Sequence, residues 1–194
     1  MTAPATFEQV IADARTMLAK GASDRSSPAH TPVVGTSDGA MRVMVLRAFD
    51  PEDLTLRFHT DIRAPKCAAI AADPRIHVLV YDCDRKVQLR LAGTGEVSGR
   101  APEVDEAWQA STAFARRCYL GEAPGTHSPI PTSGLPVEVE GIAPSEEQLR
   151  DARKNFAILK VRLEGIDWFF LDHNGHKRAI INLVDRDLDR WVAP

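Results

Sequence analysis

Residues 41–74 constrain the fold most, because two strand-like runs are followed at once by a helix start. Met41–Arg47 is rich in apolar and β-branched residues, and Leu54–Thr60 alternates apolar and polar side chains as a half-buried strand does. Asp50–Asp53 between them carries turn-forming residues. We therefore predict a β-hairpin that leads directly into a helix.

The helix start after Thr60 is the strongest candidate for a binding site. Pro65 suits the first helical position, Asp61 or Ala64 can cap, and Asp73-Pro74 ends the segment. Unpaired amides at a helix start attract anions, and Lys66 lies beside them with the Thr60 hydroxyl just upstream. This pattern predicts an anion site, although an ordinary junction without a ligand explains it as well.

Two arginines on the preceding strand could add bidentate contacts to a phosphate. Arg42 and Arg47 are five residues apart, so a regular strand points them to opposite faces. Unless a bulge brings both round, one of them is simply solvated.

The rest of the chain reads as alternating helices and strands in one domain over residues 1–194. Gln88 and Arg90 fall on the polar side of an alternating strand, where they either contact a ligand or are solvated. We interpret Gly93, Gly95 and Gly99 as bends or bulges, and 121–144, rich in Pro and Gly, as a long surface loop that is disordered or covers a site. The expected helices are 7–19 (capped by Thr6 and ended by Gly21), 101–117 and 145–155. The further expected strands are 31–36, 76–81 inside a barrel or sandwich, 87 onward, 156–163, 166–171 and 177–183. The last two are joined by a type I′ turn at Asn174-Gly175 and belong to a C-terminal strand pair at about 156–194.

Composition excludes several classes of function. A net charge of −3 gives no electrostatic reason to expect nucleic acid or an acidic membrane surface. There is no apolar run of membrane-spanning length and no secretory leader pattern, so we expect a cytoplasmic protein. The three cysteines lack metal-site or disulfide spacing, and the pair His173 and His176 lacks a third ligand, so no metal is expected.

Several motifs in this order resemble the pyridoxamine 5'-phosphate oxidase family of FMN-binding split barrels. The resemblance is close over residues 6–110, looser over 155–194 and nearly absent over 112–150. The motifs are T-x-V-V and D-G, R-V-M-V-L-R from Arg42, F-H-T-D from Phe58, D-P-R from Asp73, V-L-V-Y from Val78, Q-L-R-L-A-G-T-G-E-V from Gln88, and R-W-V-A-P at the end.

The resemblance implies a mainly β protein with flanking helices, built as an antiparallel split β-barrel of six or more strands. It also implies FMN as the cofactor, hydride transfer through the flavin N5 atom, and a homodimer with the flavin at the subunit interface. Trp108, Trp168 and Phe169 are candidates for that interface or for the monomer core. The implied FMN-binding residues are Arg42, Val43, Leu46, Arg47, His59, Thr60, Arg63, Lys66, Gln88, Arg90, Phe169 (or its neighbour Trp168) and Arg178.

The chain also departs from the family pattern. Pro65 stands where the family has an arginine before Lys66, with Arg63 as a substitute, and Ile180 stands where a late-strand arginine contacts FMN, with Lys177 and Arg178 nearby. Thr112 stands where true pyridoxamine phosphate oxidases have an arginine for the substrate phosphate. We therefore expect a divergent member, an oxidoreductase for an unidentified small molecule. The alternatives are a non-catalytic flavin-binding module, or a redox protein that uses a deazaflavin or haem.

Overall fold

The computed structural model describes residues 3–194, and the chain divides into two compact units. The first unit holds residues up to Phe58, together with Asp73–Glu96 and Lys160–Pro194. The second holds His59–Ala72 and Val97–Leu159. The expectation of a single domain over the whole chain stays a prediction. No helix within residues 3–194 is both long and apolar enough to cross a bilayer.

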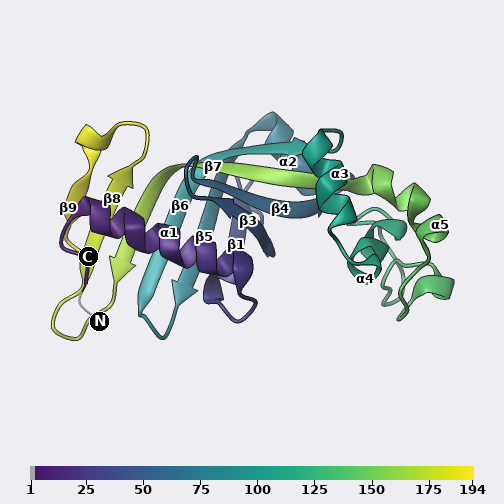
Figure 1. Cartoon of the computed structure of the whole chain (residues 1–194), viewed down its shortest axis with the longest axis horizontal. Coiled ribbons are helices and arrows are strands. Elements are labelled where there is room, and N and C mark those ends of the chain that lie inside the picture. The colour runs from purple at the N-terminus through teal and green to yellow at the C-terminus, as the bar shows by residue number, and fades with distance from the viewer. Residues whose placement is uncertain (1–2) are drawn as a thin grey trace. The chain divides into compact units, whose positions relative to one another are not determined.

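The chain forms one antiparallel sheet with flanking helices, in the strand order β2-β1-β5-β6-β7-β4-β3, with β8 paired to β7 and β9. Leu46, Leu56, Phe58 and Leu89 are fully buried in the core. The strands, labelled in Figure 1, are β1 (Val33–Thr36), β2 (Met41–Val43), β3 (Leu46–Asp50), β4 (Thr55–Asp61), β5 (Arg75–Asp82), β6 (Val87–Ser98), β7 (Phe156–Phe170), β8 (Lys177–Asn182) and β9 (Arg190–Val192).

The helix α1 (Phe7–Ser23) lies along the sheet of the first unit (Figure 1). A partly buried carboxylate fastens it there. The Asp13 carboxylate accepts a hydrogen bond from Trp168 Nε1 at 2.9 Å and forms an ion pair with Arg85. Trp168 is fully buried, so this tryptophan belongs to the monomer core. The predicted Thr6 cap is confirmed, because its side chain accepts from the Gln9 amide.

The second unit packs short helices around an aromatic core. Trp108 and Tyr119 both contact the Phe156 ring, with centroids 5.3 and 5.0 Å from it, so Trp108 also serves the monomer core. The helices of this unit are α2 (Pro65–Ala72), α3 (Pro102–Gln109), α4 (Ala113–Arg116) and α5 (Glu146–Leu149), and its 3₁₀ segments are η2 (Arg117–Leu120), η3 (Val137–Val139) and η4 (Arg150–Asn155); η1 (Pro28–His30) and η5 (Arg186–Leu188) belong to the first unit.

The predicted strand Met41–Arg47 is wrong as a single element. It is divided between β2, which pairs with β1, and β3, which forms the predicted hairpin with β4. The Met44 amide donates to the Pro32 carbonyl at the break. Arg42 and Arg47 therefore lie on different strands, and the argument from regular alternation does not apply to them.

Two glycines allow close packing, and the structure corrects a prediction at each: a helix end at Gly21 and a bulge at Gly93. Gly21 lies inside α1, where an added Cβ would meet the Ala29 carbonyl oxygen at 2.6 Å, so the helix does not end there. A Cβ on Gly93 would lie 2.1 Å from the Arg162 carbonyl oxygen. The β5–β6 register runs through Gly93 without a shift, so the bulge prediction at this position is wrong.

Three further boundaries differ from prediction. The expected helix 101–117 breaks after Gln109, because Thr112 caps a new helix through its side chain. The expected strands 156–163 and 166–171 are one strand, β7, which passes through Gly165. The β7–β8 hairpin is confirmed, but Asn174 does not have the positive φ that a type I′ turn requires.

The strand β5 is buried on one side only, whereas we expected it inside a barrel or sandwich. Ile76, Val78 and Val80 face the core, and Leu79 and Tyr81 are exposed on the other side. Met41 and Val43 of β2 are also exposed, at 75% and 63%. The sheet of the first unit therefore carries exposed apolar side chains.

Candidate cofactor site

The second unit places Lys66 and Thr60 together, as predicted. Thr60 is the next-to-last residue of β4 and is only 4% exposed. Lys66 lies in the first turn of α2, and its Nζ donates a hydrogen bond to Thr60 Oγ1 at 3.1 Å. Pro65 is the first residue of the helix, as expected. A cationic ammonium beside a hydroxyl at a helix start is an arrangement that attracts an anion.

Arg63, predicted to replace a phosphate-binding arginine, is occupied by the protein's own atoms. Its guanidinium makes a bidentate ion pair with Asp61, with Nε donating to Oδ1 at 2.9 Å and Nη2 to Oδ2 at 2.6 Å. Nη2 also donates to the Gly121 carbonyl at 3.0 Å. The hydrogen bonds to Asp61 raise the pKa of Arg63. The guanidinium thereby balances the negative charge of the Asp61 carboxylate, which lies next to Thr60 in the chain.

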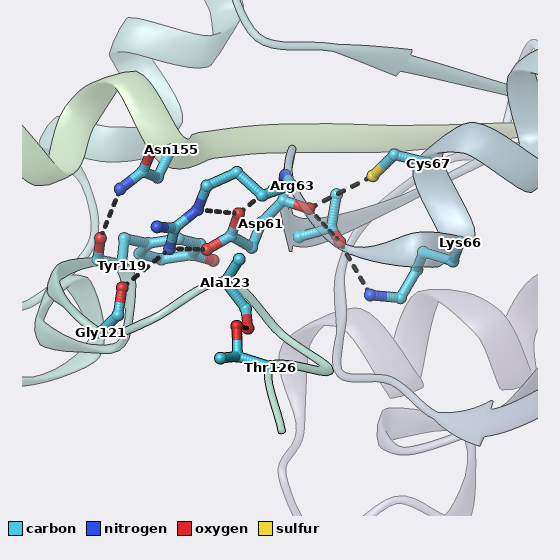
Figure 2. A network of polar contacts seen from close by, with 10 residues as sticks. Asp61, Arg63, Lys66, Cys67, Tyr119, Gly121, Ala123, Thr126 and Asn155 are labelled. Carbon is cyan, nitrogen blue, oxygen red and sulfur yellow. Dashed lines mark hydrogen bonds and ion pairs between the residues drawn. The ribbon is translucent and has the colours of Figure 1, made fainter. Parts of the chain in front are cut away.

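The neighbours of this pair form a continuous polar network, shown in Figure 2. Asp61 and Arg63 lie at its centre, with Lys66 and Cys67 on one side and Gly121 on the other. The Cys67 thiol donates to the Asp61 carbonyl at 3.2 Å, and burial raises the pKa of that thiol. A thiol in this state packs and donates rather than reacts.

The His59 ring packs against the aromatic core of the second unit. The His59 and Phe156 rings meet edge to face, with centroids 4.9 Å apart. Its predicted contact with a cofactor stays a prediction.

The predicted residues of β2 and β3 lie in the first unit and have different surroundings. The Arg42 guanidinium donates to Thr36 Oγ1 at 3.0 Å and to the Val34 carbonyl at 3.3 Å. Arg47 and Val43 are exposed. Leu46 is fully buried, so its side chain belongs to the core and only its backbone can reach a ligand.

Gln88, Arg90, Phe169 and Arg178 come together around one cavity of the first unit, as their common assignment predicted. The cavity has a volume of about 420 Å³ and is completed by Tyr81 and Leu171. The register sets Gln88 opposite Tyr81, and Phe169 opposite Arg178. Pockets of a few hundred Å³ with aromatic walls and a few polar groups are typical of small-molecule sites.

Asp167 organises this cavity, and sequence reasoning missed it. Its carboxylate accepts from Arg178 Nε at 2.9 Å and Nη2 at 2.8 Å, and it also pairs with Arg90 Nη2. The ion pair raises the pKa of Arg178. Two guanidinium groups share one carboxylate, so the three residues together carry one positive charge. A carboxylate within the apolar run Ile166–Leu171 was the available signal.

Each unit carries a set of residues whose own chemistry suits a particular kind of ligand group. The second unit supplies a lysine and a buried hydroxyl at a helix start, which suits a phosphate. The first unit supplies a net positive cavity with aromatic walls, which suits a planar ring able to carry negative charge. No cluster of three or more metal-ligating side chains occurs in the part of the chain that the structure describes.

Comparison with known proteins identifies the relatives of this chain. Residues 8–99 match the family described as pyridoxamine 5'-phosphate oxidase, FMN-binding domain. No match was found among curated proteins.

Three solved structures share the fold. A pyridoxamine 5'-phosphate oxidase-related, FMN-binding protein of Nostoc punctiforme is 22% identical with a TM-score of 0.68, and the match covers 100% of both chains. PhzG of Burkholderia lata, in complex with tetrahydrophenazine-1-carboxylic acid, is 15% identical with a TM-score of 0.65, covering 95% of this chain and 92% of that one. A Clostridium acetobutylicum protein related to general stress protein 26 is 13% identical with a TM-score of 0.57, covering 92% and 98%.

These likenesses confirm the predicted fold class, an antiparallel split barrel with flanking helices. The sequence match begins in α1 and ends just after β6, so it spans Thr60, Lys66, Gln88 and Arg90. Residues 8–99, somewhat less than half of the chain, thus match the pyridoxamine 5'-phosphate oxidase FMN-binding domain family.

Proposed function

We propose that this protein binds FMN and is an FMN-dependent oxidoreductase acting on a small molecule that is not identified. The observation that carries the proposal is the contact of Lys66 Nζ with the hydroxyl of buried Thr60 at the start of α2. That pair would hold the phosphate, because a charged donor beside a helix start binds a phosphate oxygen strongly. Arg42, Arg47 and His59 remain predicted contacts of the same cofactor.

The cavity around Gln88 in the first unit is suited, taken by itself, to a flavin ring. Its amide can donate to and accept from ring heteroatoms, while Phe169 offers an aromatic surface. Arg90 and Arg178, held by Asp167, would stabilise negative charge on the ring without having to move. Bound FMN would supply hydride acceptance at N5 and pass the electrons on.

A homodimer and a cytoplasmic location belong to the same proposal. The exposed apolar side chains of β2 and β5, defined here as the Met41–Tyr81 face, are Met41, Val43, Leu79 and Tyr81. Apolar and aromatic side chains grouped on one sheet face are typical of subunit interfaces. A second copy of the chain is the proposed occupant of this face.

Absorption spectroscopy of the purified protein tests the cofactor. On titration with FMN, we expect the absorption bands of bound flavin to rise until they saturate. Denaturation of the protein should then release FMN. A deazaflavin or a haem would give a different spectrum and a different released compound. Protein that shows no flavin absorbance after incubation with FMN contradicts the proposal.

Replacement of Lys66 tests the phosphate contact. Lys66→Ala should weaken FMN binding about ten- to a hundredfold, because a charge-assisted hydrogen bond is lost. Riboflavin, which lacks the phosphate, should bind wild type and variant alike. Lys154→Ala, which changes an exposed lysine of η4 in the same unit, is the matched control. An unchanged FMN affinity in Lys66→Ala removes the assignment.

The non-catalytic flavin-binding module is a second candidate, favoured by the segment 112–117. The Thr112 hydroxyl caps α4, Arg116 makes a bidentate pair with Glu146, and Arg117 donates to the carbonyls of Val139 and Ile142. The arginines of this segment are thus engaged inside the protein. Tight FMN binding without turnover by NADH, NADPH or pyridoxamine phosphate would favour this candidate over the enzyme.

A further inference from the structure

The loop that follows η2 lies against the start of α2. An added Cβ on Gly125 would contact Pro65 Cγ at 3.6 Å. Pro65 directly precedes Lys66, so this part of the loop lies next to the proposed phosphate site. Figure 2 shows Ala123 and Thr126 of the loop in the same view as Arg63 and Lys66.

The loop is closed on itself at a narrow neck. The Glu122 amide donates to the Gly134 carbonyl at 2.9 Å, and an added Cβ on Gly121 would lie 3.0 Å from the same oxygen. Residues 121–134 therefore form a closed loop, which we call the 121–134 loop. Gly121 is buried, whereas most of the loop beyond it is exposed.

Arg63 joins this neck to the end of β4. Its Nη2 donates to the Gly121 carbonyl at 3.0 Å while the same guanidinium holds the Asp61 carboxylate. The Arg63 amide also donates to Asp61 Oδ1 at 2.8 Å, and the Asp61 side chain is only 8% exposed. A charged donor fixed by a nearly buried partner is a rigid anchor for the carbonyl that it contacts.

We propose that Arg63 is a positioning residue that fastens the 121–134 loop against the start of α2, and that this loop slows exchange of the phosphorylated ligand bound at Thr60 and Lys66. The second half of this statement rests on the proposed function. Arg63 acts through the Gly121 carbonyl and not by contact with the phosphate. Its substitution should therefore change the rates of ligand entry and exit together, more than it changes affinity.

Hydrogen–deuterium exchange of the full-length protein without ligand tests the anchor. In Arg63→Gln, the amides of the 121–134 loop should exchange about tenfold faster than in wild type, because a charge-assisted hydrogen bond that closes the loop is gone. Arg63→Lys keeps the charge beside Asp61 but lacks the planar fork, so its exchange should be intermediate.

A matched control exists within the same unit. Arg153 also joins a carboxylate to a glycine carbonyl, through Nε to Asp105 at 2.7 Å and Nη1 to Gly99 at 3.2 Å. Arg153→Gln removes the same kind of contact without touching the loop, so exchange in 121–134 should stay at the wild-type rate. If the amides of the 121–134 loop exchange at the same rate in Arg63→Gln and in the wild type, Arg63 does not fasten the loop and this part of the proposal is wrong.

Stopped-flow measurement of FMN association and dissociation tests the effect on ligand exchange. Arg63→Gln should release FMN about tenfold faster and bind it correspondingly faster, since the loop opens more often. Wild-type rates in a variant whose loop exchanges faster overturn the gating role alone. Absence of FMN binding in the wild type overturns the proposed function and the gating role with it, while hydrogen exchange still decides the anchor.

Discussion

At the scale of single residues, Lys66 and Arg63 of the second unit differ in what their charged groups contact. Lys66 contacts a hydroxyl at a helix start, where an anion is stabilised, whereas Arg63 is bound to a carboxylate and a carbonyl of the protein. An arginine whose Nε and Nη2 donors are already engaged has fewer hydrogen bonds to offer an incoming phosphate. A basic side chain that lies near a proposed anion site is therefore not necessarily a contact of the anion.

Cys67 provides a test of this polar network that needs no cofactor. Because burial raises its pKa, less thiolate is present at a given pH, and alkylation requires the thiolate. At pH 8, iodoacetamide should modify Cys67 at least about ten times more slowly than the exposed Cys83 and Cys118, because the reaction at Cys67 also needs local opening of the structure. The rate should rise as the pH is raised above the ordinary range of a thiol. Peptide mass mapping over time gives the three rates, and a Cys67 rate equal to the others contradicts the buried, protonated thiol.

At the scale of elements, Gly93 of β6 allows the close approach of β7. Gly93→Ala would place a methyl group 2.1 Å from the Arg162 carbonyl oxygen, so the strands must separate. We expect the free energy of unfolding to fall by about 2–3 kcal/mol, the usual cost of overpacking. Chemical denaturation measures it.

Gly165→Ala on β7 is the control for that experiment. Its added methyl group would meet only the Ile181 carbonyl oxygen at 3.6 Å, an ordinary contact, so stability should change little. Equal effects of the two substitutions would mean that Gly93 is not required for the close approach.

Sequence reasoning predicted elements well where local signals decide them, and poorly where a partner strand decides. The Thr6 cap and the Pro65 helix start follow from side-chain chemistry within one turn, and both are confirmed. The division of Met41–Arg47 between two partners, and the close approach at Gly93, depend on segments far away in the sequence. Lys66 with Thr60 was predictable for the first reason, and Asp167 between two arginines was missed for the second.

At the scale of the whole molecule, the Met41–Tyr81 face predicts self-association. Val43→Glu would place a charge on this face, and burying an unpaired carboxylate in an interface is costly. Light scattering should then give the mass of one chain, 21.3 kDa, where the wild type gives about twice that mass. Val184→Glu alters a residue that is 78% exposed outside this face and should leave the wild-type mass unchanged. A wild type that is already monomeric refutes the proposed dimer.

The Asp13 pair has a consequence for how the chain folds during synthesis. Its hydrogen bond joins residues 155 positions apart, and the first unit is assembled from three separate stretches of sequence. On the ribosome, Asp13 emerges 155 residues before the Trp168 side chain that donates to it. Contacts of such long sequence separation form slowly. The first unit therefore stays incompletely assembled during this interval, and partly assembled chains expose apolar surface that chaperones cover.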